Sequence, residues 1–408
     1  MLSKTILVIY DGLGDRPIEQ FNYLTPLEAA NTPNMDKFAK KGECGIMYTL
    51  GRGVVPGSDT AHLGILGYDP LVYYNGRGPI EAVGMGLELK HGDIAFRGNM
   101  ATVDEQLNII DRRAGRIRDV SPFTKHLDGI EIDGVKFIVK PGTAHRAIVI
   151  MRGKGLSSAI SDVDPHVADS KVNVCIPLDD TEEAKHTANV LNKFMAKSFD
   201  ILSGLEINKK LQQEGKLQAN FVLVRGAGMY KQIPSFKEKF GLRGCCIAGG
   251  GLYKGVAAFL GMDVLSVEGA TALPDTNVNN KFSLAVEKSK EYDFVFVHVK
   301  ATDSLGEDGN YEGKKQFIEK IDLAFSEFEK MDNETLLVVT ADHSTPCEMK
   351  SHSADPVPIM FYGNGVRTDE VSEFNERACS HGGFHVLKGK DVMPEIMNLM
   401  RKLHLFGA

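Results

Sequence analysis

Short runs rich in Val and Ile alternate along this chain with segments of helical periodicity, and this alternation limits the folds open to it. Near-continuous apolar runs are typical of strands buried on both faces of a sheet. Helical spacing of apolar residues is clearest at 311–331 and also covers 183–200 and 392–402. Strands that alternate with helices predict an α/β fold, with a mostly parallel sheet and helices on both faces. The predicted strands are TILVIY (5–10), NFVLV (220–224), DVLSV (263–267), FVFVHV (294–299), LLVVT (336–340) and PIMFY (358–362).

The middle of the chain differs from the rest. Between about 85 and 230 the segments are shorter and richer in charge and turns, and they include the basic cluster DRRAGRIR at 111–118. A chain of 408 residues is also longer than one average domain. We therefore predict a separate, smaller α+β domain at 85–230; the positions of the reactive residues on either side of it, and the family resemblance described below, imply that it is inserted into a discontinuous core domain formed by 1–84 and 231–408.

Charge and cysteine usage exclude several classes of function. A formal net charge of -7 provides no electrostatic basis for binding nucleic acid or an anionic membrane surface. The six cysteines form no C-x-x-C pair, which is typical of a reducing compartment rather than of a disulfide framework or a zinc ribbon. No apolar run approaches the roughly 18–20 residues of a membrane-spanning helix, and the N-terminus enters a strand without a basic leader. The sequence thus predicts a cytoplasmic protein with no nucleic-acid and no membrane partner.

Side chains that can bind a metal ion lie beside four of the predicted strands. In open α/β sheets the loops at the carboxyl ends of the strands converge on one edge, where ligands bind. A mixture of Asp, His and Glu suits Mn²⁺ or Zn²⁺, and Mg²⁺ or Co²⁺ less selectively. The candidates exceed the needs of one ion and suggest two ions about 3.5–4 Å apart, an arrangement that binds both the attacking and the leaving oxygen in phosphoryl transfer. These candidates are Asp11, Asp303, Glu307, Asp308, Asp342, His343 and His352.

A serine in the stretch GVVPGSDTAHLGILGYDP (53–70) is the candidate nucleophile. A Pro-Gly turn precedes Ser58, and a helical pattern follows from Asp59. This places Ser58 near a helix N-terminus, where free N–H groups and the helix dipole favour an oxyanion or a phosphate. A free serine hydroxyl is a poor nucleophile at neutral pH, whereas a metal-bound one can ionise. His62, one turn further on, is therefore not required as the base.

Each of these features taken alone also has a purely structural explanation. Asp-Gly after a strand more often forms a turn than a metal site, and an Asp-His pair at a strand end is as often a cap as a pair of ligands. Acidic residues in a loop such as 303–308 are usually solvated, and the spacing of a calcium-binding EF-hand is not met. The basic cluster 111–118 by itself favours a solvated surface. The joint occurrence of all these features, with HSADPVP following, favours a functional site.

Together the motifs resemble those of one known family. The chain is similar over essentially its whole length to the archaeal-type cofactor-independent (2,3-bisphosphoglycerate-independent) phosphoglycerate mutases of the alkaline phosphatase superfamily. This resemblance implies an alkaline-phosphatase-like core and an isomerase of glycolysis and gluconeogenesis. Such an enzyme interconverts 3-phosphoglycerate and 2-phosphoglycerate through a phosphoserine intermediate and needs no bisphosphoglycerate. The motifs that carry the resemblance are VIYDGLGD, TPNMD, PGSDTAHLGILGYDP, NGRGPIEAVGMG, DRRAGRI, HR at 145–146, SDVDPH, KATD, TADHSTPC and HSADPVP.

The resemblance implies a role for each residue of the predicted metal site. Ser58 would be the residue that is transiently phosphorylated. Where the family commonly has a histidine, this chain has Glu307, followed by Asp308. We predict Glu307 as the substitute ligand and Asp308 as the alternative, and a carboxylate there should shift the preference from Zn²⁺ toward Mn²⁺ or Mg²⁺. The implied ligands of one ion are Asp11, Ser58, Asp342 and His343, and those of the other are Asp303, His352 and this third residue.

The resemblance also places substrate recognition in the inserted domain. Phosphoglycerate carries a phosphate and a carboxylate, for which the bidentate guanidinium group of arginine is the expected partner. Asp162 and Asp164 would orient these groups or handle a hydroxyl proton, and Lys254 would contribute from the core domain. Closure of the inserted domain, on hinges near 85 and 230, would exclude water and prevent hydrolysis of the phosphoserine. The candidate substrate-binding residues are Arg112, Arg113, Arg116, His145, Arg146, Asp162, Asp164, His166 and Lys254.

The sequence leaves alternative functions open. A metal-dependent phosphatase, or a mutase for another substrate such as a phosphopentose, would use the same metal core. A non-catalytic metal-binding paralogue is opposed by the intact Ser58 and slightly favoured by the altered loop at 303–308. A sulfatase is disfavoured, because Ser58 is followed by Asp-Thr-Ala-His rather than by the Pro and Arg of the sulfatase nucleophile motif.

Overall fold

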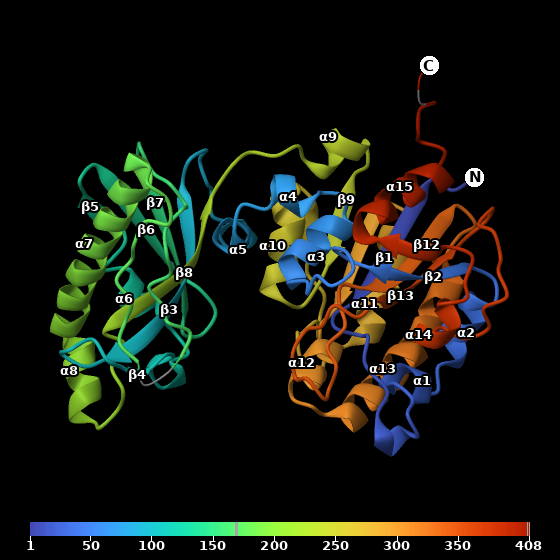
Figure 1. The fold of residues 1–408 in the computed structure, drawn as a ribbon, viewed down its shortest axis with the longest axis horizontal. Coiled ribbons are helices and arrows are strands. Elements are labelled where there is room, and N and C mark those ends of the chain that lie inside the picture. Colours follow the sequence, from blue (N-terminus) through green and yellow to red (C-terminus); the bar gives the residue numbers. More distant parts are fainter. Residues whose placement is uncertain (168–169, 406, 408) are drawn as a thin grey trace. The chain divides into compact units, whose positions relative to one another are not determined.

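The computed structural model describes residues 1–167, 170–405 and 407. These residues form two compact units, each with its own sheet (Figure 1). The first unit comprises Met1–Tyr74 and Ile233–Ala408, and the second comprises Asn75–Gln232. Within the described ranges, no helix is long and apolar enough to cross a membrane.

The first unit is built on a sheet whose described strands have the order β10-β9-β11-β1-β12-β13-β2-β14. Neighbouring strands are parallel except where β13 pairs with β12 and with β2. The predicted α/β fold with a mostly parallel sheet is therefore confirmed. Of the predicted strands, only 220–224 lies elsewhere, in the second unit. The strands of this sheet are β1 (Lys4–Tyr10), β2 (Glu43–Tyr48), β9 (Gly244–Ile247), β10 (Asp263–Leu265), β11 (Phe294–Val299), β12 (Thr335–Ala341), β13 (Val357–Tyr362) and β14 (His385–Lys388).

Helices cover both faces of this sheet, as predicted. Successive side chains of a strand point to opposite faces, so Thr5 and Tyr10 of β1 lie on opposite sides. The Thr5 hydroxyl donates a hydrogen bond to Sδ of Met400, just beyond α15, at 3.3 Å. On the other side, burial and then the charge of Asp322 on α13 raise the pKa of Tyr10. The helices of the first unit are α1 (Pro26–Ala29), α2 (Pro33–Ala39), α3 (Ser58–Ile65), α4 (Pro70–Tyr73), α9 (Phe236–Phe240), α10 (Gly251–Phe259), α11 (Val278–Lys288), α12 (Ala301–Glu307), α13 (Tyr311–Phe325), α14 (Glu376–Cys379) and α15 (Gly389–Leu399), with 3₁₀ turns at Glu19–Phe21 and Ser326–Lys330.

Three adjacent strands, β11, β1 and β12, bring the predicted metal ligands to one edge. Tyr10, the last residue of β1, pairs with Val299 at the end of β11 and with Ala341 at the end of β12. The segments that follow these residues therefore leave the sheet at the same level. Strand β13 runs antiparallel to β12, so its N-terminal end, which follows His352, lies at this edge as well.

The acidic segment 303–308 is not the loop that the sequence predicts. Residues Ala301–Glu307 form helix α12 directly after β11. Gly306 within this helix permits close packing, because a Cβ there would lie 2.4 Å from the carbonyl oxygen of Thr345. Asp303 lies in the first turn of this helix, where the helix dipole favours a negative charge.

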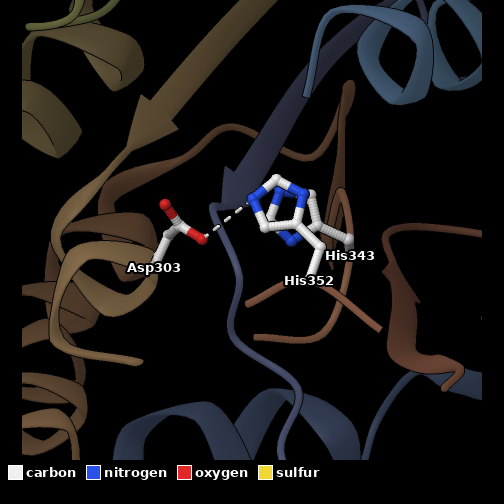
Figure 2. Close-up of side chains that lie close together, drawn as sticks. All are labelled: Asp303, His343 and His352. Carbon is white, nitrogen blue, oxygen red and sulfur yellow. Dashed lines mark ion pairs between the residues drawn. The ribbon is translucent and has the colours of Figure 1, made fainter. Parts of the chain in front are cut away.

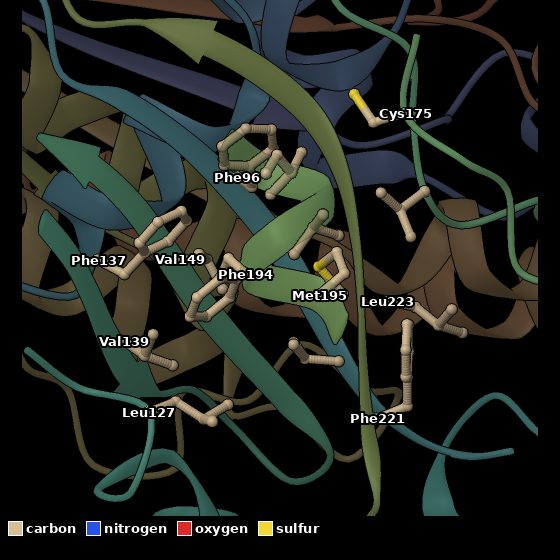
Figure 3. Close-up of a cluster of buried hydrophobic side chains, with 14 of the residues drawn as sticks. Phe96, Leu127, Phe137, Val139, Val149, Cys175, Phe194, Met195, Phe221 and Leu223 are labelled. Atoms are coloured by element: carbon tan, nitrogen blue, oxygen red, sulfur yellow. The ribbon is translucent and has the colours of Figure 1, made fainter. Parts of the chain in front are cut away.

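The second unit contains an antiparallel sheet with the strand order β4-β3-β7-β6-β5, in which β8 also pairs with β3. Helix α7 packs on this sheet, and Figure 3 shows the buried apolar side chains between them. At the centre, Phe194 of α7 stacks on Phe137 of β6, with ring centroids 3.9 Å apart. The elements of this unit are β3 (Ile94–Val103), β4 (Ile109–Asp111), β5 (Glu131–Ile132), β6 (Val135–Pro141), β7 (Arg146–Arg152), β8 (Phe221–Met229), α5 (Arg77–Gly84), α6 (Ser121–Thr124), α7 (Glu182–Gly204) and α8 (Glu206–Gln213), with a 3₁₀ turn at Ala114–Arg116.

The boundary between the units differs from the predicted one. The prediction divided the chain after residues 84 and 230, whereas the structure divides it after Tyr74 and Gln232. Helix α5 belongs to the second unit because its Ala82 packs in a small apolar cluster with residues of β3 and β7. Gly78 allows this close packing, since a Cβ there would lie 2.0 Å from the carbonyl oxygen of Ala95.

Glu376, at the start of α14, carries a carboxyl group with an unusual proton affinity. It accepts hydrogen bonds from the backbone N–H of Asp15 at 3.3 Å and from the hydroxyl of Thr25 at 2.8 Å. Burial, helped by the nearby charge of Glu28, raises the pKa of Glu376 to about 7. The folded protein therefore binds this proton more tightly than the unfolded chain does.

Glu376→Gln should remove part of the pH dependence of stability. Because the pKa of Glu376 is higher in the folded state, its contribution to stability is present below about pH 4.5 and is lost as the pH rises to about 7. Glutamine keeps an acceptor and cannot ionise, so we expect the variant to be more stable than the parent at pH 8, by up to about 3 kcal/mol. Urea unfolding between pH 5 and pH 8 measures this, with exposed Glu370→Gln as the control. If the free energies of unfolding of the parent and of Glu376→Gln changed in parallel with pH, this would contradict the raised pKa of Glu376.

Candidate metal centre

Two groups of metal-capable side chains meet at the carboxyl edge of the first unit's sheet. Asp11, Asp342 and His343 form one group, and Asp303, His343 and His352 form the other. Within each group, one possible ligand atom of each residue lies within 4.8 Å of the others. Figure 2 shows the imidazole rings of His343 and His352 face to face, with centroids 3.6 Å apart, and Asp303 beside His352. His343 thus belongs to both groups, which the sequence did not indicate.

The first group has the chemistry of a cation site. Oδ1 of Asp11 and Oδ2 of Asp342 are buried and accept no hydrogen bond, and they lie 3.3 Å and 3.2 Å from Nε2 of His343. Burial alone would raise the pKa of Asp11, but Lys300, His298 and His343 bring it well below its usual range. Buried, ionised carboxylates with free lone pairs suit a divalent ion that accepts oxygen and imidazole ligands.

Lys300 is a cation of this centre that the sequence analysis did not select. Its ammonium group forms ion pairs with Oδ2 of Asp11, at 3.3 Å, and with Oδ2 of Asp303. Burial lowers the pKa of Lys300, but Asp11 and Asp303 raise it above its ordinary value. The residue lies in the KATD motif, at the N-cap of α12. Its position between a predicted strand and the predicted ligand Asp303 was the sequence feature that could have identified it.

Ser58 is the first residue of α3, as the sequence predicts. Its Oγ lies 3.3 Å from Nε2 of His343, so the candidate nucleophile reaches the imidazole that both groups share. His62 is buried in the same helix, and its Nδ1 lies 2.6 Å from the carbonyl oxygen of Ser58 and 3.5 Å from Oδ2 of Asp342. His62 therefore contacts the backbone carbonyl of Ser58 through its Nδ1.

Aromatic side chains enclose Asp11 from the side of α10. The Tyr253 hydroxyl donates a hydrogen bond to Oδ2 of Asp11, and its ring stacks on His298 with centroids 3.4 Å apart. Nε2 of His298 lies 3.2 Å from the same carboxylate oxygen, and burial lowers the pKa of His298 to about 4. Sequence reasoning missed both residues, although a histidine inside the apolar strand FVFVHV was a visible irregularity.

Glu307 lies close to the second group without being part of it. It is the last residue of α12, one helical turn after Asp303, and it is exposed. Partial desolvation of its carboxyl group by the neighbouring protein, and then the charge of Asp303, raise the pKa of Glu307, while Lys300 and His352 oppose this rise. Asp308 follows the helix and is also exposed. The carboxyl group of Glu307 therefore interacts electrostatically with both Asp303 and His352.

In the second unit, Arg112 is held in a tight ion pair. Its guanidinium donates two hydrogen bonds from Nη2 to the buried carboxylate of Asp164, at 2.7 Å and 2.9 Å, and one from Nη1 to the carbonyl oxygen of His166. Asp162 accepts a hydrogen bond from the backbone N–H of Gly226 and lies 3.0 Å from Nε2 of His166. Arg112, Asp164, Asp162 and His166 are thus held in place by hydrogen bonds and ion pairs within the second unit. The side chains of Arg113 and Arg116 are exposed.

Two further arginines, which the sequence analysis did not select, lie on one face of the second unit's sheet. Arg97 of β3 pairs with Arg225 of β8, and Asn99 of β3 pairs with Arg146 of β7. Alternate residues of β3 share a face, so all four side chains point to the same side. Burial is the main cause that lowers the pKa of Arg97 to about 10. Burial, followed by the charge of Arg146 and more weakly that of Arg97, also lowers the pKa of His145. The face carries three arginines, of which Arg97 lies 3.5 Å from the carboxylate of Glu81 and Arg225 lies 3.7 Å from that of Asp164.

Substitutions at the metal centre should affect its two groups differently. Because Nε2 of His343 faces Asp11 and Asp342 while its ring stacks on His352, we expect His343→Ala to abolish binding at the site of Asp11 and Asp342 and to weaken the other site, whereas Asp11→Asn and Asp303→Asn should each weaken one site. Isothermal titration with Mn²⁺ gives the stoichiometry, and thermal unfolding with excess ion gives the accompanying stabilisation, about 2.7 kcal/mol per site at a hundred times Kd. Exposed His381→Ala is the control. Full Mn²⁺ binding at the site of Asp11 and Asp342 in His343→Ala would contradict the place of His343 in this group.

Comparison with known proteins identifies the family. Residues 3–399 match the Metalloenzyme superfamily. The chain is 51% identical over 411 residues to 2,3-bisphosphoglycerate-independent phosphoglycerate mutase 1 of Methanocaldococcus jannaschii, covering 100% of this chain and 99% of that protein. A solved structure of a Pyrococcus horikoshii protein matches with a TM-score of 0.85 and 38% identity over 100% of both chains. The cofactor-independent phosphoglycerate mutase of Thermoplasma acidophilum matches with a TM-score of 0.74 and 36% identity, over 98% of this chain and 100% of that one. This chain therefore belongs to the metalloenzyme superfamily and, within it, to the family of archaeal 2,3-bisphosphoglycerate-independent phosphoglycerate mutases.

Proposed function

We propose that this protein is a phosphoglycerate mutase that interconverts 3-phosphoglycerate and 2-phosphoglycerate through a phosphoserine at Ser58. The observation that carries the proposal is the position of the Ser58 hydroxyl, at the N-terminus of α3 and 3.3 Å from the imidazole that both ligand groups share. A phosphoryl group on Ser58 would lie where the helix dipole favours negative charge. Full-length relatives with that activity in their names support the same assignment.

The metal-binding roles follow from the two groups. Asp11, Ser58, Asp342 and His343 would hold one divalent ion, and Asp303, Glu307 and His352 the other. Bound ions of this kind lower the pKa of a hydroxyl ligand and stabilise the charge of a transferring phosphoryl group. The oxygen-rich ligand set favours Mn²⁺, with Mg²⁺, Co²⁺ or Zn²⁺ as alternatives. Tyr253 and His298 would keep the Asp11 carboxylate oriented through their contacts with its Oδ2.

The second unit would supply the recognition of the anionic substrate. Arg113, Arg116 and Arg146 are exposed and offer guanidinium donors to a carboxylate or a phosphate. Arg112 and Asp164, with Asp162 and His166, would orient this region through the ion pairs that they form. His145 would add a donor beside Arg146, and Lys254 of α10 would contribute from the first unit. Glycerate held by such contacts would re-orient and take the phosphoryl group back from Ser58 on its other hydroxyl.

Ser58→Ala is expected to abolish the mutase activity. The purified protein is incubated with Mn²⁺ and 3-phosphoglycerate in the absence of bisphosphoglycerate, and 2-phosphoglycerate and free phosphate are both followed. The parent should produce mainly 2-phosphoglycerate, and the variant should lose on the order of a thousandfold or more in rate, because the group that receives the phosphoryl is gone. Exposed Ser326→Ala is the control. If free phosphate is the parent's main product, the protein is a phosphatase and not a mutase. If Ser58→Ala remains active, the phosphoserine intermediate is excluded.

Glu307→His should change the metal preference of the second ion site. Imidazole is a softer ligand than carboxylate, so the ratio of Zn²⁺ to Mn²⁺ affinity should rise by about tenfold. Competition titrations of the parent, Glu307→His and the matched neighbour Asp308→His measure this ratio. A change in Asp308→His with none in Glu307→His would assign the ligand to Asp308 instead.

A further inference from the structure

A lysine ammonium is completely buried beneath the metal centre, outside both ligand groups. Lys314 lies in the first turn of α13, and its side chain is 0% exposed. Its Nζ donates hydrogen bonds to Oδ2 of Asp15 at 2.8 Å, to the carbonyl oxygen of Thr345 at 3.0 Å and to that of Gly14 at 3.1 Å. These three acceptors satisfy all three N–H bonds of the ammonium group. A charge buried in this way is stable only while every partner stays in place.

The acceptors come from the two loops that carry metal ligands. Gly14 and Asp15 follow Asp11 at the end of β1, and Thr345 follows His343 at the end of β12. The loops also contact each other directly. The backbone N–H of Thr345 donates to the carbonyl oxygen of Gly14 at 3.0 Å, and the N–H of Cys347 donates to the Asp15 carboxylate at 3.1 Å. Lys314 therefore joins two loops that are more than 300 residues apart in the sequence.

Thr345 extends this connection to the ligands themselves. Its hydroxyl donates a hydrogen bond to Oδ1 of Asp303 at 2.6 Å and lies 3.1 Å from Nδ1 of His343. A hydroxyl has one proton to donate, so Thr345 accepts from Nδ1–H of His343. This leaves Nε2 of His343 as the atom that faces Asp11, Asp342 and Ser58. A partner on one ring nitrogen selects the other as the metal-binding atom.

Two glycines restrict the position of Thr345 further. A Cβ at Gly12, where φ is +60°, would lie 2.4 Å from Oγ1 of Thr345. A Cβ at Gly306 would lie 2.4 Å from the carbonyl oxygen that accepts from Lys314. The loop after β12 is thus packed against the loop after β1 and against α12, and small movements of Thr345 would be transmitted to Asp303 and His343.

We propose that Lys314, with its counter-ion Asp15, is a positioning residue of the metal centre. Its ammonium holds the loops after β1 and β12 together, fixes Thr345, and so sets the orientation of His343 and Asp303. The proposal rests on the ligand assignment made above and is independent of the identity of the phosphorylated substrate. Lys315, the next residue, is the natural comparison, because it is partly exposed, forms a 3.8 Å ion pair with Glu319 on its own helix and lies 5.8 Å from the centroid of the Phe21 ring, away from the metal ligands.

The test compares Lys314→Met with Lys315→Met. Methionine preserves much of the side-chain volume and removes the charge. Mn²⁺ affinity is measured by isothermal titration and by the electron paramagnetic resonance signal of the free ion, on full-length protein whose fold is checked by circular dichroism. We expect Lys314→Met to weaken Mn²⁺ binding by about 10–100-fold, the effect typical of removing a residue that orients a ligand, and Lys315→Met to bind as the parent does.

The outcomes separate a positioning role from a merely structural one. A Lys314→Met protein with a lower melting temperature without metal, but with the parent's Mn²⁺ affinity, would overturn the proposal. Should Lys314→Met not fold, Asp15→Asn replaces it, since asparagine retains an acceptor for the N–H of Cys347. Unchanged Mn²⁺ affinity in Asp15→Asn would likewise overturn the proposal. A parent protein that binds no metal would instead refute the ligand assignment.

Discussion

The concentration of buried negative charge at one edge of a parallel sheet is the constraint on which the rest of this structure depends. Asp11, Asp303 and Asp342 are each 0% exposed, and they follow three strands that lie side by side. Carboxylates this close repel one another and are costly to bury without cations. Lys300 and the shared His343 lie among them. The loops must hold these groups against their own repulsion, which gives a physical reason for the dense hydrogen bonding around Thr345 and Lys314.

The second unit shows the opposite arrangement of charge. Its antiparallel sheet places Arg97, Arg225 and Arg146 on one face, and burial together with neighbouring cations depresses the pKa of Arg97 to about 10. Cations gathered in this way bind anions more strongly than they would in water, because less solvent competes for them. The two units thus gather opposite kinds of ionisable side chain, arginines on a sheet face in the second unit and carboxylates at a sheet edge in the first.

Much of the metal centre was predictable from local sequence patterns. Apolar runs marked the strands, and the polar residues just beyond them were selected as ligands because strand ends in an α/β sheet face a common edge. Other members escaped this reasoning. His298 lies inside a strand and Tyr253 lies on a helix. Lys300 is a cation and therefore not a metal ligand, which was the property used to choose the candidates. The helical state of 301–307 was also missed, since Gly306 is explained by close packing against Thr345 and not by a turn.

By itself, the sequence determined the α/β class, the candidate nucleophile at the start of a helix and the residue types of the candidate metal centre, because periodicity, helix starts and strand ends are local properties. Only the tertiary structure decided that β11, β1 and β12 are neighbours, that His343 belongs to both ligand groups, and that Lys314 joins the loops after β1 and β12. These facts depend on the order of strands in the sheet and on contacts between residues some 300 positions apart. No pattern within a short window of sequence specifies such contacts, because they are selected by the packing of the whole unit.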